Sequence, residues 1–254
     1  MNIAFYVGRS GIIAHSNSLN ISAQNVTNIS SIGYKATTTD FRELIYNQMD
    51  QNINKELDNE HKILNGHGVK VQSDPLQFSQ GQFQMTEYDL DFALASDNCL
   101  FAVDRRGTTQ YTRNGAFDAS VENENGTDHI YLVTSDGAYV LDNQNQKIEI
   151  PKDEQGKLDI DGLTNRIGVF YFENPYALFR YDGQSFAPTP ESGEPQVATP
   201  GQYDILQGAI ERSNVNLAKE MSDIIVTQKA YAFSAKVVQT ADEVEDIVNN
   251  LRQG

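Results

Sequence analysis

The 254-residue sequence contains few cysteines, few basic residues and no long apolar run, and each scarcity argues against a class of protein. Its single cysteine, Cys99, excludes an internal disulfide framework and a Cys-x-x-Cys pair for zinc or redox chemistry. The 19 basic residues face 35 acidic ones, and the resulting net charge of −16 repels phosphate backbones and anionic membranes. No apolar stretch approaches the roughly 20 residues of a membrane span. We therefore expect no nucleic-acid partner and no membrane insertion.

Residue patterns typical of catalysis, cofactor binding or metal binding are also missing. The histidines never occur at the i, i+4 or His-x-His spacings that metal sites favour. The sequence does not exclude a pair of catalytic carboxylates like that of a glycosidase, although no residue pattern points to one. We expect no catalytic, cofactor-binding or metal-binding residues, and we interpret Cys99 as a small buried apolar residue. The histidines are His15, His61, His67 and His129.

The C-terminal part of the chain contains neither glycine nor proline from Ala209 to Gln253. Apolar residues recur there at spacings of three and four, which predicts a long helix. Ser213 or Asn216 can cap its start, and Glu220 in the first turn suits the helix dipole. One apolar stripe comprises Val226, Ala230, Phe233, Val237, Ala241, Val244, Val248 and Leu251, and a second on a neighbouring face comprises Leu217, Met221, Ile224, Gln228, Tyr231, Ala235 and Val238.

The N-terminal segment shows a helical period on a composition that disfavours helix. Its apolar residues Phe5, Ile12, Leu19 and Val26 recur every seven residues, which predicts an amphipathic helix to about residue 30. The residues between them are mostly Ser, Asn and Gly, which are weak helix formers. Such a segment fits a helix that forms when it docks against other chains.

The middle of the chain, from about Gly66 to Phe186, alternates apolar and polar residues. This alternation predicts strands with one buried face, for example at residues 90–94, 99–103 and 167–171. Turn sequences such as Asp104-Arg105-Arg106-Gly107 separate the strands, so we expect an antiparallel β domain of hairpins. The polar stretch before it predicts a connector, with a short apolar patch at Phe41, Leu44, Ile45 and Met49.

These patterns together predict an α+β fold. The long N- and C-terminal helices are expected to pair as a coiled-coil-like core, and a central, mainly antiparallel β domain is expected between them in the sequence. The predicted division places the N-terminal helix of an inner domain at residues 1–36, the connector at 37–65, the β domain at 66–207 and the C-terminal helix of the inner domain at 208–254.

The segment from Asn25 to Lys35 resembles the Asn-Ile-Ala-Asn-x-x-Thr-x-Gly-Tyr-Lys signature of flagellar rod and hook proteins. The terminal helix and motifs of the middle region, such as the segment 111–117, are similar to the same family, so the resemblance covers essentially the whole chain. Ser96 and Asn98 stand where the family usually has glycines, and we expect Asn98 to adopt a positive φ. The motif residues are Asn25, Asn28, Gly33, Tyr34, Lys35, Ser213, Asn214, Val215, Gln228, Tyr231, Thr240 and Asp242.

The resemblance implies a structural subunit of the bacterial flagellar basal-body rod and no enzyme activity or cofactor. Such a subunit would polymerise into a helical tube that transmits torque and encloses the export channel. Its partners would be further copies, other rod proteins, the hook protein and the flagellar type III export apparatus. It would lie outside the cytoplasmic membrane without a cleaved signal peptide. By analogy, subunit packing would use Phe5, Ile12, Leu19, Val26, Leu217, Met221, Ile224, Phe233, Val237, Val244 and Val248.

Two alternatives stay open at this point. Within the family, the chain length and the connector favour the distal rod type, and the proximal rod or another hook-basal-body paralogue is the alternative. From a different class, a secreted adhesin or a cell-wall hydrolase on a helical stalk would also combine helices with a β domain. An adhesin predicts an oligomer of fixed size, and a hydrolase requires a carboxylic acid of raised pKa in a cleft.

Overall fold

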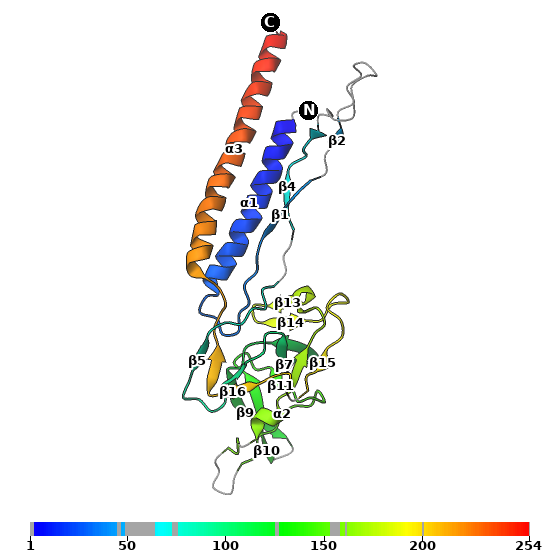
Figure 1. Ribbon diagram of the computed structural model, residues 1–254, viewed down its shortest axis with the longest axis vertical. Helices are drawn as coiled ribbons and strands as arrows, with labels where there is room; N and C mark the ends of the chain where they lie inside the picture. The colour runs from blue at the N-terminus through cyan, green and yellow to red at the C-terminus, as the bar shows by residue number, and fades with distance from the viewer. Residues whose placement is uncertain are drawn as a thin grey trace. The chain divides into compact units, whose positions relative to one another are not determined.

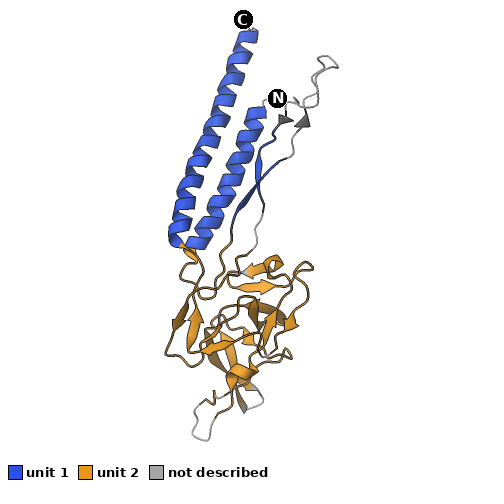
Figure 2. Cartoon of the chain, in the orientation of Figure 1, with its two compact units in different colours: residues 1–26, 38–74, 217–254 blue, residues 27–37, 75–216 orange. Residues whose placement is uncertain are grey.

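The computed structural model describes residues 3–44, 47–48, 64–72, 76–124, 127–152, 158–160, 162–199 and 201–253. The chain divides into two compact units (Figure 2). Unit 1 comprises residues 1–26, 38–74 and 217–254, and unit 2 comprises residues 27–37 and 75–216. Each unit is therefore assembled from segments that are distant in the sequence.

Unit 1 contains the two long helices, α1 (Ile3–Thr27) and α3 (Leu217–Gln253), which lie side by side and run in opposite directions (Figure 1). Near one end the Asn25 side-chain amide donates a hydrogen bond of 3.0 Å to Glu220 Oε1. Near the other, a Cβ added to Gly8 would lie 2.7 Å from a methyl carbon of Val238. In the described part of the chain, neither helix is long and apolar enough to cross a membrane.

The surface that α1 buries consists of small and polar residues. Gly8 and Gly11 let the two backbones approach closely, since a Cβ on Gly11 would lie 2.8 Å from Ser234 Oγ. This packing provides the stabilisation that the weak helix formers of α1 do not provide by themselves. The buried residues of the helix are Gly8, Gly11, Ala14, Ser18, Ser22 and Asn25.

A two-stranded antiparallel ribbon of β1 (Asp40–Glu43) and β4 (Val69–Gln72) lies on the other side of α1 from α3 (Figure 1). The amide of Val69 donates to Ser10 Oγ at 3.2 Å, which ties β4 to α1. Of the apolar patch predicted here, Phe41 and Leu44 are described and Ile45 and Met49 lie outside the described residues. Two short strands, β2 (Asn47–Gln48) and β3 (Leu64–Asn65), also pair with each other.

Unit 2 is built from antiparallel strands, and its described part contains a nine-stranded sheet. The sheet has the order β13-β14-β8-β7-β11-β10-β9, with β12 pairing to β7 and β15 to β12. Two further pairs, β6 with β16 and β5 with β17, complete the unit with the short helices α2 (Leu163–Arg166) and η1 (Pro175–Ala177). The strands are β5 Phe83–Met85, β6 Phe92–Leu94, β7 Cys99–Arg105, β8 Thr108–Thr112, β9 Phe117–Glu124, β10 Thr127–Thr134, β11 Tyr139–Val140, β12 Val169–Tyr171, β13 Phe179–Asp182, β14 Ser185–Ala187, β15 Gln196–Val197, β16 Ile205–Gln207 and β17 Ala209–Glu211.

The central strand β7 is buried on both faces, so the prediction of a single buried face is wrong for this strand. Phe101 and Val103 belong to one apolar cluster, and Leu100 and Ala102 belong to a second cluster on the opposite face. The sequence of β7 explains this result, because residues 99–103 are all apolar and both faces can leave water.

Two local predictions also differ from the structure. The C-terminal helix begins at Leu217, directly after Asn216, one of the two residues expected at its start. Residues 209–211, which the predicted division placed with that helix, instead form strand β17, which pairs with β5. Among the described residues, the non-glycine positions with positive φ are Arg106 and Asn145. The expectation of a positive φ at Asn98 is therefore wrong, and the turn that leads into β7 does not require the left-handed conformation there.

Candidate functional site

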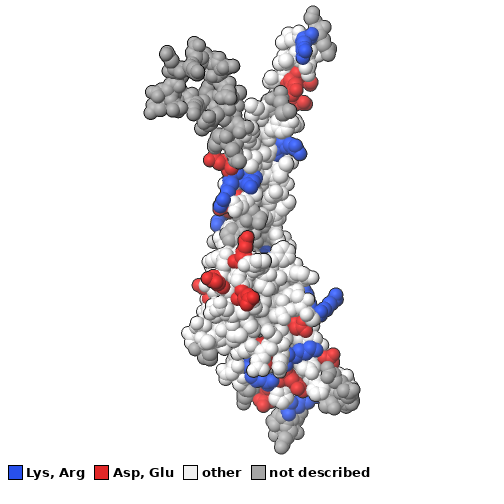
Figure 3. All heavy atoms as spheres, turned by 90° about the vertical axis from the view of Figure 1, so that its right-hand side faces the viewer, with Lys and Arg blue, Asp and Glu red and all other residues white. Residues whose placement is uncertain are grey.

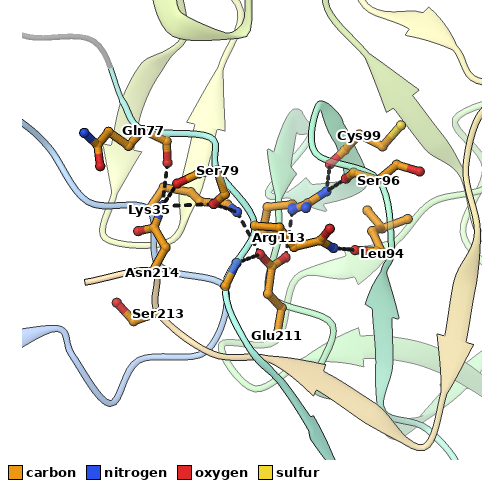
Figure 4. A network of polar contacts seen from close by, with 12 residues as sticks. Lys35, Gln77, Ser79, Leu94, Ser96, Cys99, Arg113, Glu211, Ser213 and Asn214 are labelled. Carbon is orange, nitrogen blue, oxygen red and sulfur yellow. Dashed lines mark hydrogen bonds and ion pairs between the residues drawn. The ribbon is translucent and has the colours of Figure 1, made fainter. Parts of the chain in front are cut away.

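A buried cluster of charged residues lies in unit 2 (Figure 4). The carboxylate of Glu211 at the end of β17 accepts from two cations, with 2.8 Å to Lys35 Nζ and 2.9 Å to Arg113 Nε. The side chains of all three residues are at most 1% exposed. Removing ions from water is costly unless each one is paired and hydrogen-bonded, so the geometry of this cluster matters for folding.

Backbone groups satisfy part of the remaining hydrogen-bonding capacity of the cluster, whereas Arg113 Nη2 is buried without a hydrogen-bond partner among the described residues. The Gly81 amide donates to Glu211 Oε1 at 2.7 Å, and Lys35 Nζ donates to the Ser79 carbonyl at 2.9 Å. Arg113 Nη1 donates to the carbonyls of Ser96 and Cys99 at 2.5 and 2.6 Å. The cluster thus joins residues 35, 79–81, 96–99, 113 and 211, which are far apart in the sequence.

The electrostatic environment of Lys35 differs from that of a surface lysine. Burial and the neighbouring Arg113 guanidinium lower the pKa of Lys35 to about 8, although the Glu211 carboxylate opposes the shift. Two cations share one carboxylate, so the ammonium form is held less firmly than it would be in a simple pair. Cys99, at the edge of the same cluster, is 5% exposed, and burial raises the pKa of its thiol.

Asn214 fastens the segment that precedes α3 to the segment that follows α1. Its side-chain oxygen accepts from the Ala36 amide at 2.7 Å, and its amide group donates to the carbonyls of Gln77 and Ser79 at 2.8 and 3.0 Å. One asparagine side chain therefore satisfies backbone groups of two other segments, which no apolar residue could do.

The Gly33-Tyr34-Lys35 motif adopts a backbone that requires glycine. Gly33 has a φ of +67°, and a Cβ there would lie 2.5 Å from the backbone of Arg113. Next to it, Arg180 donates to the Tyr34 hydroxyl at 3.0 Å and to the Lys35 carbonyl, and its guanidinium lies 4.6 Å from the centre of the Tyr34 ring. Tyr34 is 1% exposed, so the motif is part of the interior of unit 2.

The motif residues from the sequence thus fall into two groups. Gly33, Tyr34, Lys35 and Asn214 belong to the buried contacts of unit 2, and Asn25 contacts Glu220 in unit 1. Ser213 Oγ accepts from the Val215 amide at 3.3 Å, and Asn28 Oδ1 accepts from Ser31 Oγ at 3.2 Å. The motif positions on α3, which are Gln228, Tyr231, Thr240 and Asp242, are all exposed.

Most residues expected to pack between subunits have accessible side chains in the single chain. Phe233 is 67% exposed, Met221 56% and Val244 55%. Phe5, Leu217, Val237 and Val248 are also exposed, and Ile12, Leu19, Val26 and Ile224 are half-buried. At the contact between α1 and α3, Gly8 and Gly11 lie against Ser234, Val237 and Val238 of α3, and Val237 still remains 42% exposed.

The sequence did not indicate that Glu211 is buried, that Asn214 binds backbone groups of other segments, or that Arg113 pairs with the same carboxylate as Lys35. Lys35 and Arg113 lie within recognised motifs, but Glu211 is 176 residues from Lys35 in the sequence and only the fold brings them together. The available signal was that Glu211 directly follows the apolar residues Ala209 and Ile210, so a strand there would bury a carboxylate that needs a partner. Among the described residues, no group of three or more His, Cys, Asp and Glu side chains is placed to hold a metal ion.

Comparison with known proteins agrees with these motifs. Residues 206–251 match the family described as flagellar basal body rod FlgEFG protein C-terminal. The flagellar basal-body rod protein FlgG of Borreliella burgdorferi is 30% identical over 98% of this chain and 98% of its own length. FlgG of Agrobacterium fabrum is 31% identical over 97% and 98% of the two chains.

A third relative is the flagellar hook-basal body complex protein FlhP of Bacillus subtilis, with 29% identity over 91% of this chain and 92% of its own. Similarity at this level along nearly the whole length includes both helices and the β unit between them. The chain belongs to the family of flagellar basal-body rod proteins that includes FlgG.

Proposed function

We propose that this chain is a subunit of the flagellar basal-body rod that polymerises with further copies of itself into a helical tube. The tube would enclose the export channel and transmit torque, with α1 and α3 pairing as its inner layer. The subunit would be exported by the flagellar apparatus without a cleaved signal and would act outside the cytoplasmic membrane. Neighbouring rod proteins and the hook protein would contact its ends.

The observation that carries this proposal is the distribution of large apolar side chains on unit 1. Val226 and Phe233 on α3 are each 67% exposed, and Tyr6 and Ile13 on α1 are 46% and 50% exposed. A single soluble subunit gains nothing from apolar residues arranged along a helix in water, and such surfaces commonly mark protein contacts. Further copies that cover these residues would gain the free energy of their burial.

The buried cluster of unit 2 supports a mechanical role. It fastens together the residues that follow α1 and those that precede α3 through ion pairs and side-chain hydrogen bonds to the backbone. A subunit that transmits torque needs such cross-links, because the chain segments leading to the helices must not slide under load. The names of the relatives, which are rod and hook-basal body proteins, point in the same direction.

Hydrogen exchange on the monomer and on concentrated protein tests the proposal. We expect amides of residues 3–27 and 217–253 to become protected together as electron microscopy shows filaments growing. The amides of β7 and β8 serve as the internal control, since they should be protected in both states. A monomer that never polymerises at any concentration, with both helices already fully protected, would contradict the proposal and favour a self-contained binding protein.

A further inference from the structure

The last part of α3 extends beyond α1. Asn25 contacts Glu220, Gly11 lies against Ser234 and Gly8 lies against Val238, so paired positions move in opposite directions along the two helices. Continuing this register places Ile3, the first described residue of α1, beside about residue 242 of α3. Residues 243–253 of α3 therefore have no described residue of α1 opposite them.

This projecting segment, which we call the α3 tail (residues 243–253), is both apolar and acidic. Val244, Ile247, Val248 and Leu251 recur at spacings of three and four and are 55–78% exposed. Glu243, Glu245 and Asp246 accompany them, with Arg252 as the basic residue of the tail. Figure 3 shows acidic side chains near one end of unit 1. The tail has the pattern of a helix that lies in an apolar groove with a basic rim.

A groove of this kind exists on unit 1, between α1 and the residues Leu44 and His67, which lie next to the β1–β4 ribbon in the sequence. The cavity has a volume of about 520 Å³, and its apolar lining includes Ile3, Tyr6, Ile13 and Leu44. Ile3, Tyr6 and Ile13 are 43–50% exposed. The lining also includes Arg9 and His67, and no residue of the described lining is acidic. We call this cavity the α1–ribbon groove.

The tail of the same chain does not occupy the α1–ribbon groove. In α1, Gly8 and Gly11 face α3, whereas Tyr6, Arg9 and Ile13 line the groove on a different side of the helix. A straight α3 that packs against the glycines cannot also reach those groove residues. Figure 1 likewise shows α3 and the ribbon on opposite sides of α1.

We propose that the α3 tail of one copy docks into the α1–ribbon groove of a second copy. The tail would place its aliphatic side chains against Ile3, Tyr6 and Ile13, and its acidic residues beside Arg9 and His67. Because tail and groove are different surfaces, each added copy leaves one of each free, and the contact repeats from copy to copy as an open helical polymer requires. The inference rests on the proposed polymerisation and specifies one contact that builds it.

Single-cysteine variants test whether tail and groove meet between copies. In a Cys99→Ser background, a copy with Leu251→Cys is mixed with a differently tagged copy that carries Ile13→Cys, and the mixture is oxidised under polymerising conditions. We expect a disulfide-linked dimer that contains both tags. The control replaces the second copy with one that carries Met85→Cys, a residue of unit 2 that is 74% exposed, and should give no comparable product.

A substitution in the tail tests whether the contact contributes to growth. Ile247→Gln removes an aliphatic side chain and keeps helix propensity, and we expect the concentration needed for polymerisation to rise about tenfold. Val121→Thr in β9, where the native side chain is equally exposed at 59%, should leave that concentration within about twofold. Far-ultraviolet circular dichroism checks that both variants fold.

The charge contact has its own test. Arg9→Glu should hinder growth, and combining it with Glu243→Lys, Glu245→Lys and Asp246→Lys in the same chain should restore it. Wild-type protein that never polymerises would overturn the proposed function itself. Wild-type polymers combined with no mixed disulfide and no effect of Ile247→Gln would overturn only the docking of the tail.

Discussion

The two units of this chain place their large apolar residues differently. In unit 2 they form two clusters around β7, where Phe101 is fully buried. In unit 1 the buried seam consists of residues such as Gly8, Gly11 and Ser22, and the larger Phe233 is 67% exposed. Unit 2 thus has a core of its own, whereas unit 1 leaves large apolar residues exposed. Under the proposed function, this difference would separate the part that supports the fold from the part that supports assembly.

The largest expected effect comes from breaking the charged cluster of unit 2. Glu211→Gln keeps the side-chain shape but leaves Lys35 and Arg113 buried without a counter-charge, which should cost about 3–5 kcal/mol of unfolding free energy. Urea unfolding followed by tyrosine fluorescence measures this loss, since the chain has no tryptophan. Glu191→Gln, at an exposed position, is the control and should change little. Equal midpoints for the two variants would show that the cluster does not stabilise unit 2.

Truncating one phenylalanine in each unit tests the comparison directly. Phe101→Ala should destabilise the monomer by about 3–5 kcal/mol, because a buried ring that contacts Phe117 is replaced by a cavity. Phe233→Ala should change monomer stability by less than about 0.5 kcal/mol, because its ring is mostly in water.

Phe233→Ala should instead weaken polymer growth, measured by light scattering, because that ring is expected to pack between subunits. If Phe233→Ala destabilised the monomer as much as Phe101→Ala does, the ring would be part of the fold of the single chain. The division between a folding unit and an assembly unit would then be wrong at this position.

Two glycines with positive φ offer a smaller, matched test. Gly137→Ala, in an open turn with φ +78°, should cost about 1–2 kcal/mol from the left-handed backbone alone. Gly33→Ala, with φ +67°, should cost at least about 1 kcal/mol more, because its Cβ would meet the Arg113 backbone at 2.5 Å. Thermal unfolding of both variants gives the difference. Similar costs for the two variants would mean that the backbone near Gly33 and Arg113 shifts at little cost to admit the Cβ.

The sequence predicted the elements whose signals are local. The spacing of apolar residues from Val226 to Leu251 predicted α3, because this pattern depends only on neighbouring residues. Strands were also predicted where β7 and β12 lie, although the alternation inferred for β7 does not hold, because its residues 99–103 are all apolar. The family motif around Gly33 and Lys35 was also recognised. The pairing of the two helices as a coiled coil, the domain limits and the packing residues stay predictions.

Long-range contacts were beyond sequence reasoning. The sequence pattern predicted packing by the apolar heptad of Phe5 and Ile12, whereas the seam of α1 uses Gly8 and Gly11, which let another helix approach closely. The pairing of Glu211 with Lys35 depends on two segments that only the whole fold brings together. A scan for small residues at helical spacing would have found the seam, but no local pattern reports an ion pair of this separation.

The smallest expected effect is a pH dependence that belongs to unit 2. The pKa of Lys35 is about 8 in the folded chain and 10.5 without its surroundings, so the unfolded chain binds more protons between these values. Stability should therefore rise with pH, by at most about 2 kcal/mol from pH 8 to 9.5. Burial raises the pKa of Tyr111 to about 12, which lowers stability only above pH 10, whereas the raised pKa of the buried Cys99 thiol lowers stability above about pH 9 and acts equally in any variant that keeps Cys99.

Urea unfolding of the wild type and of Lys35→Met from pH 7 to 9.5 isolates this term, because the variant lacks the titrating amine. We expect the unfolding free energy of the wild type, relative to that of the variant, to increase as pH rises. Helix α3 of unit 1 should show no parallel change in circular dichroism. A difference that is flat over the whole range would mean that Glu211 holds the ammonium form of Lys35 as firmly as water does, and that the second cation does not weaken the pair.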